Sequence, residues 1–190
     1  GLWAGRYIVL GVTFALKRGG SPQLRYGELS RALGPDPDLR AVREAVLALR
    51  RSKAMVLDPD EPDSRSAGSF FLNPVLSPDD AAHAARAARG LRSGEDLPRW
   101  PTADGQVKVP AAWLIEAAGI QKGERCGGAA VSRRHSLALV NRDGATAADI
   151  VALAGRVRAR VQDAFGVTLV PEPRFLGFDR PVDQLLKEHS

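Results

Sequence analysis

Residues 146–166 read TAADIVALAGRVRARVQDAFG, and this stretch carries the clearest helix signal in the chain. Thr146 and Asp149 have the spacing of a capping box, and Gly166 stands where a helix end favours glycine. Apolar residues recur at helical spacing on one face: Ile150, Leu153, Val157, Val161 and Phe165. This stripe predicts an amphipathic helix with one buried face, against which the neighbouring segments must pack.

The segments on both sides of this helix predict extended structure. GGAAVS (127–132) and SLALVN (136–141) are short apolar runs joined by an Arg-Arg-His turn, as expected of two strands. VTLVPEPRFLG (167–177) contains two prolines, and the residue before each proline avoids the helical region. We therefore expect strands before the helix and an extended segment after it.

The rest of the chain mixes helices with one further strand. Tyr7–Leu16 is rich in β-branched and aromatic residues and predicts a strand. Helical patterns occupy residues 36–53, 77–94 and 109–120, and residues 25–33 predict a short helix or a turn. Because these elements do not alternate strictly, the sequence predicts an α+β fold of mixed small sheets packed with helices.

Composition limits the class of protein. The chain has 190 residues, of which 44% are hydrophobic and 26% charged, as in a globular protein. It contains no apolar run long enough for a membrane span and no signal-peptide pattern at its start. The single cysteine, Cys126, excludes an intrachain disulfide and predicts a reducing, cytoplasmic location. We expect no membrane partner.

The net charge of +5 suits either a nucleic acid or a small anionic ligand. The arginines are scattered among alanines, as on the solvated faces of helices, and the aromatic residues are not interleaved with them. A basic nucleic-acid binder is therefore the less favoured alternative, and we expect no nucleic-acid partner.

Two side chains are candidates for acid chemistry. Ser69 lies in SAGSFFLNP (66–74), between a flexible Ala-Gly step and two phenylalanines. It either closes a turn before a buried strand or presents its hydroxyl in a cleft. Glu172 has a proline on each side, so its backbone is stiff, and it is either an exposed turn residue or a positioned acid.

Other titratable residues carry weaker signals. Lys53 and Lys108 are each consistent with a surface position or with binding of phosphate or carboxylate, whereas a lone histidine such as His135 is usually structural or surface-exposed. The three histidines and the cysteine lack the spacing of metal ligands, so we expect no metal site. No P-loop, G-x-G-x-x-G or G-x-S-x-G motif occurs.

Four motifs together resemble the UDP-N-acetylenolpyruvoylglucosamine reductase family (MurB, UDP-N-acetylmuramate dehydrogenase) of bacterial peptidoglycan synthesis. They are SAGSFFLNPV, ADGQVKVPAAWLIEAAGIQKG, GGAAVSRRHSLALVN and LVPEPRFLG, in this order. RYGEL and LRRSK upstream add to the match, which runs from about Arg6 to about Gly177. The resemblance implies a reductase that passes a hydride from NADPH through FAD to UDP-N-acetylglucosamine enolpyruvate.

The resemblance also implies roles for individual residues. Ser69 would donate a proton to the substrate, and Glu172 would stabilise the enol-type intermediate as a general acid. Substrate contacts would fall at Tyr26, Lys53, Asn73, Trp100, Lys108 and His135. Trp100 stands where the family often has tyrosine, so a hydroxyl contact is missing there.

One family feature has no counterpart in this sequence. The family carries an N-terminal FAD-binding domain, and the chain looks like the portion that follows it. We therefore expect residues 1–20 to be the end of the FAD-binding-side domain with its last strand, 21–177 the substrate-binding domain and 178–190 a polar, partly frayed tail. A separate chain would supply the FAD domain. The alternative is a non-catalytic UDP-sugar-binding remnant that is inactive without such a domain.

Overall fold

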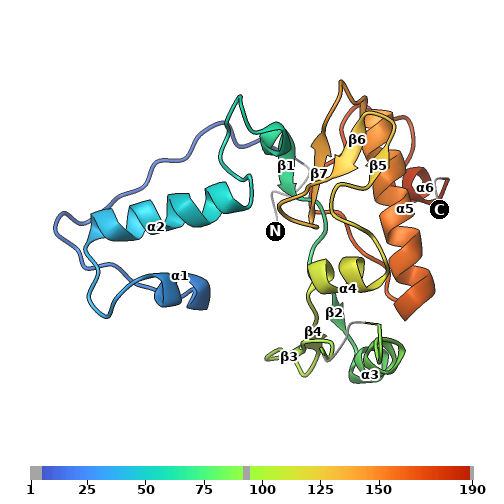
Figure 1. Ribbon diagram of the computed structural model, residues 1–190, viewed down its shortest axis with the longest axis horizontal. Helices are drawn as coiled ribbons and strands as arrows, with labels where there is room; N and C mark the ends of the chain where they lie inside the picture. Colours follow the sequence, from blue (N-terminus) through green and yellow to red (C-terminus); the bar gives the residue numbers. More distant parts are fainter. Residues whose placement is uncertain (1–5, 92–94, 189–190) are drawn as a thin grey trace. The chain divides into compact units, whose positions relative to one another are not determined.

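The structure is a computed structural model that describes residues 6–91 and 95–188 of the chain (Figure 1). It divides into two compact units, Gly1–Leu49 and Arg50–Ser190. The predicted segment 1–20 begins outside the described residues, as does the end of the segment 178–190. The predicted domain boundaries at 20/21 and 177/178 stay predictions.

The first unit holds a short helix, α1 (Gly27–Ala32), and most of a longer one, α2 (Leu39–Ser52). The sequence predicted a helix at α2 and a short helix or turn at α1, and both are helical. The backbone N–H of Ala41 donates to the Asp38 carboxylate (2.6 Å) near the start of α2, which satisfies one of the free donors there. Among residues 6–49 the single buried hydrophobic side chain is Leu29.

The strand predicted over Tyr7–Leu16 is wrong. This segment has no strand structure, and its large apolar side chains are mostly exposed. A strand is stable only when another strand satisfies its backbone groups, and no strand among the described residues pairs with this segment. Its residue types favour a strand, but the pairing is missing.

The second unit contains a four-stranded antiparallel sheet in the order β1-β7-β6-β5. Its strands are β1 (Ser66–Ser69), β5 (Arg125–Cys126), β6 (Ala129–Val131) and β7 (Ala138–Asn141). The long helix α5 (Ala147–Phe165) contacts β5, β6 and β7 (Figure 1). The two strands predicted upstream of the helix are β6 and β7, so this part of the prediction is confirmed.

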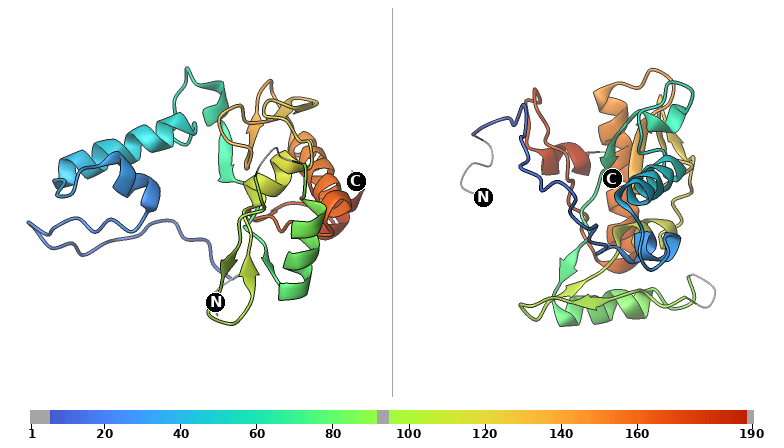
Figure 2. Two further views of the ribbon diagram at one scale, coloured as in Figure 1. Left: turned by 60° about the horizontal axis from the view of Figure 1, so that its bottom comes forward. Right: turned by 90° about the vertical axis from the view of Figure 1, so that its left-hand side faces the viewer.

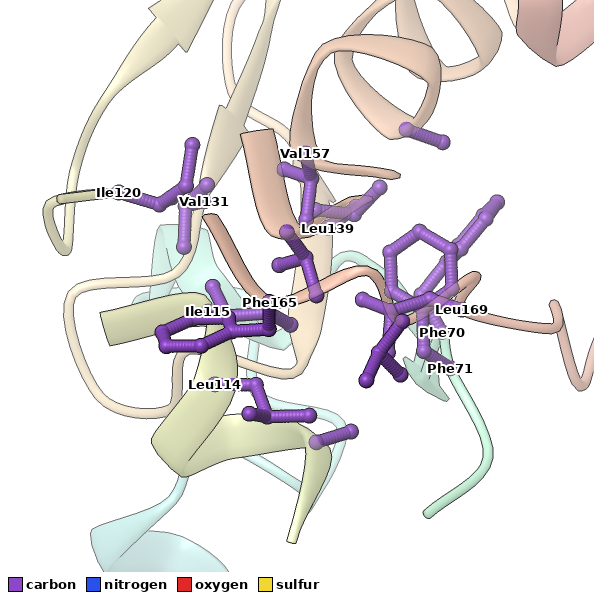
Figure 3. Packing of buried hydrophobic residues seen from close by; sticks show 14 of the residues in the cluster. Phe70, Phe71, Leu114, Ile115, Ile120, Val131, Leu139, Val157, Phe165 and Leu169 are labelled. Carbon is purple, nitrogen blue, oxygen red and sulfur yellow. The ribbon is translucent and has the colours of Figure 1, made fainter. Parts of the chain in front are cut away.

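Helix α5 has the ends that its sequence predicted. Thr146 and Asp149 form a reciprocal capping box, and Gly166 closes the helix in the left-handed conformation (φ 70°). The stripe from Leu153 to Phe165 is buried and forms the centre of the core (Figure 3). Ile150, one turn earlier, is half-buried.

A second, three-stranded sheet has the order β2-β4-β3, with strands β2 (Val75–Leu76), β3 (Trp100–Pro101) and β4 (Val107–Lys108). Helix α3 (Pro78–Ala87) lies beside this sheet in both views of Figure 2 and contacts β2. Helix α4 (Ala111–Ala117) follows β4 and contacts α5. Mixed helices and two small antiparallel sheets confirm the α+β class.

The prediction of a partly frayed tail is wrong for residues 182–187, and residues 189–190 lie outside the described residues. Helix α6 (Val182–Lys187) packs against α5, and its Leu185 and Leu186 are buried. The tail is polar on average, but these two apolar residues are enough to fix it on the core. Arg158 of α5 also pairs with Asp183 (2.8 Å).

Candidate active site

A bulge in β1 places Ser69. Ser66 pairs with Val140 and Ser69 pairs with Ala138, so β1 holds one more residue than β7 between these two pairs. Gly68 takes up the extra length with a positive φ of 84°, which favours glycine. Because side chains alternate along a strand, the extra residue brings Ser69 to the face that Ser66 occupies. Ser69 is half-buried there.

The residue after Ser69 is held from both sides. The N–H of Phe70 donates to the carbonyl of Leu137 (2.7 Å), and the carbonyl of Phe70 accepts from the N–H of Glu172 (2.9 Å). One step on, Phe71 forms an isolated bridge with Pro171. The backbone that follows Ser69 is thus held between Leu137, directly before β7, and the segment that carries Glu172.

Glu172 lies on this paired segment, one backbone step across from the Ser69 strand, and its side chain is exposed. Pro171 and Pro173 restrict φ on both sides of it. The structure therefore brings together the backbone segments of the two predicted acids, although many residues separate them in the sequence.

The two phenylalanines after Ser69 are core residues. Phe70 and Phe71 are buried, with their ring centroids 5.1 Å apart in an edge-to-face arrangement. Phe70 also meets Phe175 edge-on at 6.1 Å, which ties the Glu172 segment to the same cluster. Figure 3 shows both rings beside Leu169. Their packing makes the backbone on which Ser69 stands rigid.

His135 lies in the turn between β6 and β7, two residues before Leu137. Its N–H donates to the hydroxyl of Ser132 (3.3 Å), and its carbonyl accepts from Ala138 (2.9 Å). Since Leu137 binds Phe70, this turn borders the strand that carries Ser69.

Trp100 and Lys108 are cross-strand partners in the second sheet, and Val75 pairs with Lys108 from the other side. Paired residues share a face, so an indole and an ammonium group lie side by side on an exposed surface. Asn73 lies on the connection from Ser69 to Val75, and its side-chain oxygen accepts from the N–H of Ala111 (2.9 Å) at the start of α4. Asn73 thus has a structural contact at the position where a substrate contact was predicted.

The remaining two predicted residues belong to other elements. Lys53 follows the end of α2 and is half-buried. Tyr26 is the N-cap residue of α1, in the first unit, and is exposed.

Sequence reasoning missed a buried carboxylate in this region. Asp63 is 2% exposed and belongs to the short 3₁₀ turn Pro62–Ser64. Its oxygens bind Ser132, Arg133 and Arg142. Asp63 stands among other acidic residues in a polar, proline-rich loop, and nothing in that loop distinguishes it from its solvated neighbours.

Three carboxylates of the second unit have a lowered pKa, of which Asp104 and Asp143 are exposed and Asp149 is half-buried. The hydrogen bond from Arg125, with its charge, lowers the pKa of Asp143. Hydrogen bonds from the backbone and the hydroxyl of Thr146 lower the pKa of Asp149. The hydroxyl of Thr102 lowers the pKa of Asp104 in the β3–β4 hairpin. In all three cases the interactions stabilise the ionised carboxylate.

Together these elements define an α+β domain that joins the strand of a hydroxyl to the segment of a carboxylate and carries an aromatic-basic pair in its second sheet. The chain belongs to the UDP-N-acetylenolpyruvoylglucosamine reductase family, because the model of the family's C-terminal domain matches residues 59–176. This confirms the resemblance seen in the motifs.

Individual relatives agree. The reductase of Thermobifida fusca is 52% identical over 178 residues, which is 90% of this chain and 50% of the relative. That of Mycobacterium tuberculosis is 51% identical over 178 residues, with 90% and 48% covered. That of Streptomyces coelicolor is 49% identical over 179 residues, with 90% and 47% covered. The chain spans about half the length of the curated relatives it matches.

The pockets near Ser69 and Glu172 do not fit a flavin dinucleotide. One, of about 230 Å³, is lined by Phe70, Phe175 and other mainly apolar groups. The next, of about 420 Å³, follows residues 170–183 and includes three prolines, which have no N–H to offer a phosphate. Neither contains a glycine-rich turn of the kind that cradles pyrophosphate.

None of the helices among the described residues has both the length and the apolar character needed to cross a membrane. Within residues 6–91 and 95–188, no three His, Cys, Asp or Glu side chains are grouped so that they could hold a metal ion.

Proposed function

We propose that this chain forms the substrate-binding part of a UDP-N-acetylenolpyruvoylglucosamine reductase, which reduces UDP-N-acetylglucosamine enolpyruvate during peptidoglycan synthesis. Family membership supports the proposal. The observation that carries the site is the backbone pairing of Phe70 with Glu172, because it joins the strand of Ser69 to the segment of the second acid.

Reduction of an enolpyruvyl double bond needs two additions. When hydride reaches one alkene carbon, the electron pair of the double bond moves to the α-carbon and into the adjacent carboxylate. A proton must then reach the α-carbon, and we propose that the Ser69 hydroxyl donates it. A proton donor has to be positioned before the reaction, and the bulge at Gly68 together with the packing of Phe70 supplies a fixed backbone for it.

Glu172 would act on the charge that develops in the substrate carboxylate. As a general acid, it would donate a hydrogen bond or a proton to the enol-type oxygen. The flanking prolines keep its backbone extended, so the position of the side chain depends on few torsions.

The basic and aromatic groups would bind the anionic substrate. Lys108 and Trp100 lie side by side in the second sheet, where an ammonium and an indole suit a diphosphate and a planar base. We propose further contacts from Tyr26, Lys53, Asn73 and His135.

FAD and NADPH are proposed at the level of the family alone, as the source of the hydride. Neither pocket beside the Glu172 segment contains the glycine-rich turn that cradles the pyrophosphate of a flavin dinucleotide. The same observation favours a second candidate for the chain assayed by itself, a UDP-sugar-binding module that is inactive without a separate FAD domain.

Calorimetric titration of the purified chain with UDP-N-acetylglucosamine enolpyruvate tests the proposal. We expect saturable binding that is lost in a Lys53→Ala, Lys108→Ala double variant. A Lys122→Ala, Lys187→Ala variant removes the same charge elsewhere and controls for general electrostatics. No binding by the folded wild type, or equal loss in both double variants, would contradict the proposed site.

A second arm separates the reductase from the binding module. An FAD domain from a relative is added in trans, and NADPH oxidation is followed with substrate present. Activity that Ser69→Ala lowers by about 10²- to 10⁴-fold, without weaker substrate binding, supports the role of Ser69 as proton donor. Binding without any turnover would support the non-catalytic module.

A further inference from the structure

Asp63 is the buried carboxylate with the most contacts to other segments in the part of the chain that is described. One oxygen accepts from the hydroxyl of Ser132 (2.9 Å) and from the N–H of Arg133 (2.6 Å), while the other pairs with Arg142. The side chain of Asp63 is 3% exposed and that of Arg142 15%. A buried carboxylate with three partners has little freedom to move.

Ser132 links Asp63 to the turn between β6 and β7. Its hydroxyl donates to Asp63, so its lone pairs are directed at two other donors, the N–H groups of Arg134 (3.0 Å) and His135 (3.3 Å). Ser132 itself is fully buried. One carboxylate thereby fixes the turn that carries His135.

The same turn reaches the strand of Ser69. Leu137, two residues after His135, accepts the hydrogen bond from the N–H of Phe70 (2.7 Å). Asp63 also precedes β1 in the sequence, and between them Arg65 accepts from the N–H of Asn141 (2.9 Å). Asp63 therefore constrains the β1–β7 pair where β1 begins, and the hydrogen bond of Phe70 constrains it where β1 ends.

This pairing needs an external constraint because its register shifts between Ser66 and Ser69. A bulged pair can lose its extra residue by slipping one step, and a slip of one step turns every later side chain to the opposite face. Such a slip would move Ser69 away from its present face.

We infer that Asp63 is a positioning residue for the site: through Ser132 it holds the His135 turn and, through Leu137 and Phe70, the register that aims Ser69. This inference rests on the proposed function for its meaning to the substrate, but not for its structural part. Asp63 touches neither Ser69 nor any group assigned to the reaction.

Amide hydrogen exchange of the full chain without ligand tests the structural part. In Asp63→Asn we expect the amides of Arg134, His135 and Phe70 to exchange about 10- to 100-fold faster, the range for loss of a hydrogen bond to a charged group. The amides of α5 should keep their rates. Ser132→Ala is a milder variant that leaves the Asp63–Arg142 pair in place, and it should give the same local pattern at His135 and Phe70.

Two controls make the pattern specific. Asp60→Asn is the same chemical change three residues away, at an exposed carboxylate, and should leave the exchange rates unchanged. Val161→Ala removes buried methyl groups from α5 and lowers stability without touching the turn. If Asp63→Asn raises exchange by one factor throughout, as a merely destabilising change would, or if Ser132→Ala leaves His135 and Phe70 unchanged, the inference is overturned.

Titration with UDP-N-acetylglucosamine enolpyruvate then tests the functional part. At a temperature where every variant is folded, Asp63→Asn should weaken binding about tenfold relative to wild type, while Asp60→Asn and Val161→Ala bind as wild type does. Unchanged affinity in Asp63→Asn, despite the local exchange pattern, would overturn the role in the site. If the wild type itself fails to bind, the proposed function fails, and hydrogen exchange still decides whether Asp63 fixes the turn.

Discussion

The two sheets of the second unit differ in how they present their residues. The β1-β7-β6-β5 sheet is covered by α5, and every residue of β6 and most of β7 are buried. In the β2-β4-β3 sheet, Trp100 and Pro101 are exposed, as is Lys108. The first sheet carries the proposed proton donor at its edge, whereas the second carries proposed ligand contacts.

This difference reflects two physical requirements, one for transferring a proton and one for binding a charged ligand. A group that transfers a proton must be held to a fraction of an ångström, which needs a packed and hydrogen-bonded support. A group that binds a charged ligand needs access to solvent and can stand on a small, open sheet. The connection from Phe70 to Pro74 joins the two sheets and so links the two kinds of residue.

The largest expected effect compares one substitution on the two sheets. Val140→Ala removes a fully buried side chain from β7 and should lower the free energy of unfolding by about 2 to 3 kcal/mol. Val75→Ala removes a side chain that is 48% exposed from β2 and should cost under about 1 kcal/mol. Denaturant titration of both variants measures the difference. Equal costs would show that the second sheet is packed as tightly as the first.

The sequence predicted local features of this arrangement better than distant ones. The capping box of α5 and its closing glycine involve residues within one turn of each other, so spacing alone reveals them. The tail prediction relied on average polarity and overlooked the buried pair Leu185 and Leu186. The strand prediction at Tyr7–Leu16 used residue types, which carry no information about a partner strand.

In the candidate site, too, contacts between distant residues could not be predicted from local patterns. The Asp63 carboxylate meets Ser132 across 69 positions of sequence and Arg142 across 79, and no local pattern encodes such pairs. The pairing of Phe70 with Glu172 also joins distant segments. The candidate residues were predicted because the motifs resemble a family, whereas their physical juxtaposition required the fold.

An intermediate effect compares two glycines with positive φ. Gly68 lies in the β1 bulge (φ 84°) and Gly105 in the β3–β4 hairpin (φ 77°), and neither has an atom within 4 Å of an added Cβ. Alanine at either position should therefore cost about 1 kcal/mol, from backbone strain alone. Thermal unfolding measures this cost.

The two glycine variants should differ in their effect on the backbone at Ser69. We expect Gly68→Ala to shift the amide resonances of Ser69 and Phe70, because the bulge sets their register, and Gly105→Ala to leave them unchanged. Unchanged resonances in Gly68→Ala would mean that the bulge does not depend on glycine.

A smaller effect concerns a buried hydroxyl beside His135. Ser136 is 2% exposed, and its Oγ has no hydrogen-bond partner among the described residues. Removing an unsatisfied buried hydroxyl removes a desolvation cost, so Ser136→Ala should stabilise the protein by up to about 1 kcal/mol. Ser132→Ala is the matched change at a satisfied hydroxyl and should destabilise it. If Ser136→Ala also destabilises, the hydroxyl has a partner such as an ordered water.

The smallest expected effect is on the acid limb of stability. Asp149 and Asp104 have lowered pKa values in the folded chain, so the unfolded chain binds protons at a higher pH than the folded one. Their contribution is therefore complete at neutral pH and is lost as the pH falls through the ordinary carboxylate range, below about pH 4, toward the lowered values. Asp149 caps the helix that covers the first sheet, whereas Asp104 supports only the exposed hairpin. Asp149→Asn should therefore flatten the fall of Tm between about pH 5 and pH 3 more than Asp104→Asn does. An equal flattening in both variants would indicate that the hairpin contributes as much to cooperative unfolding as α5, against the contrast between the two sheets.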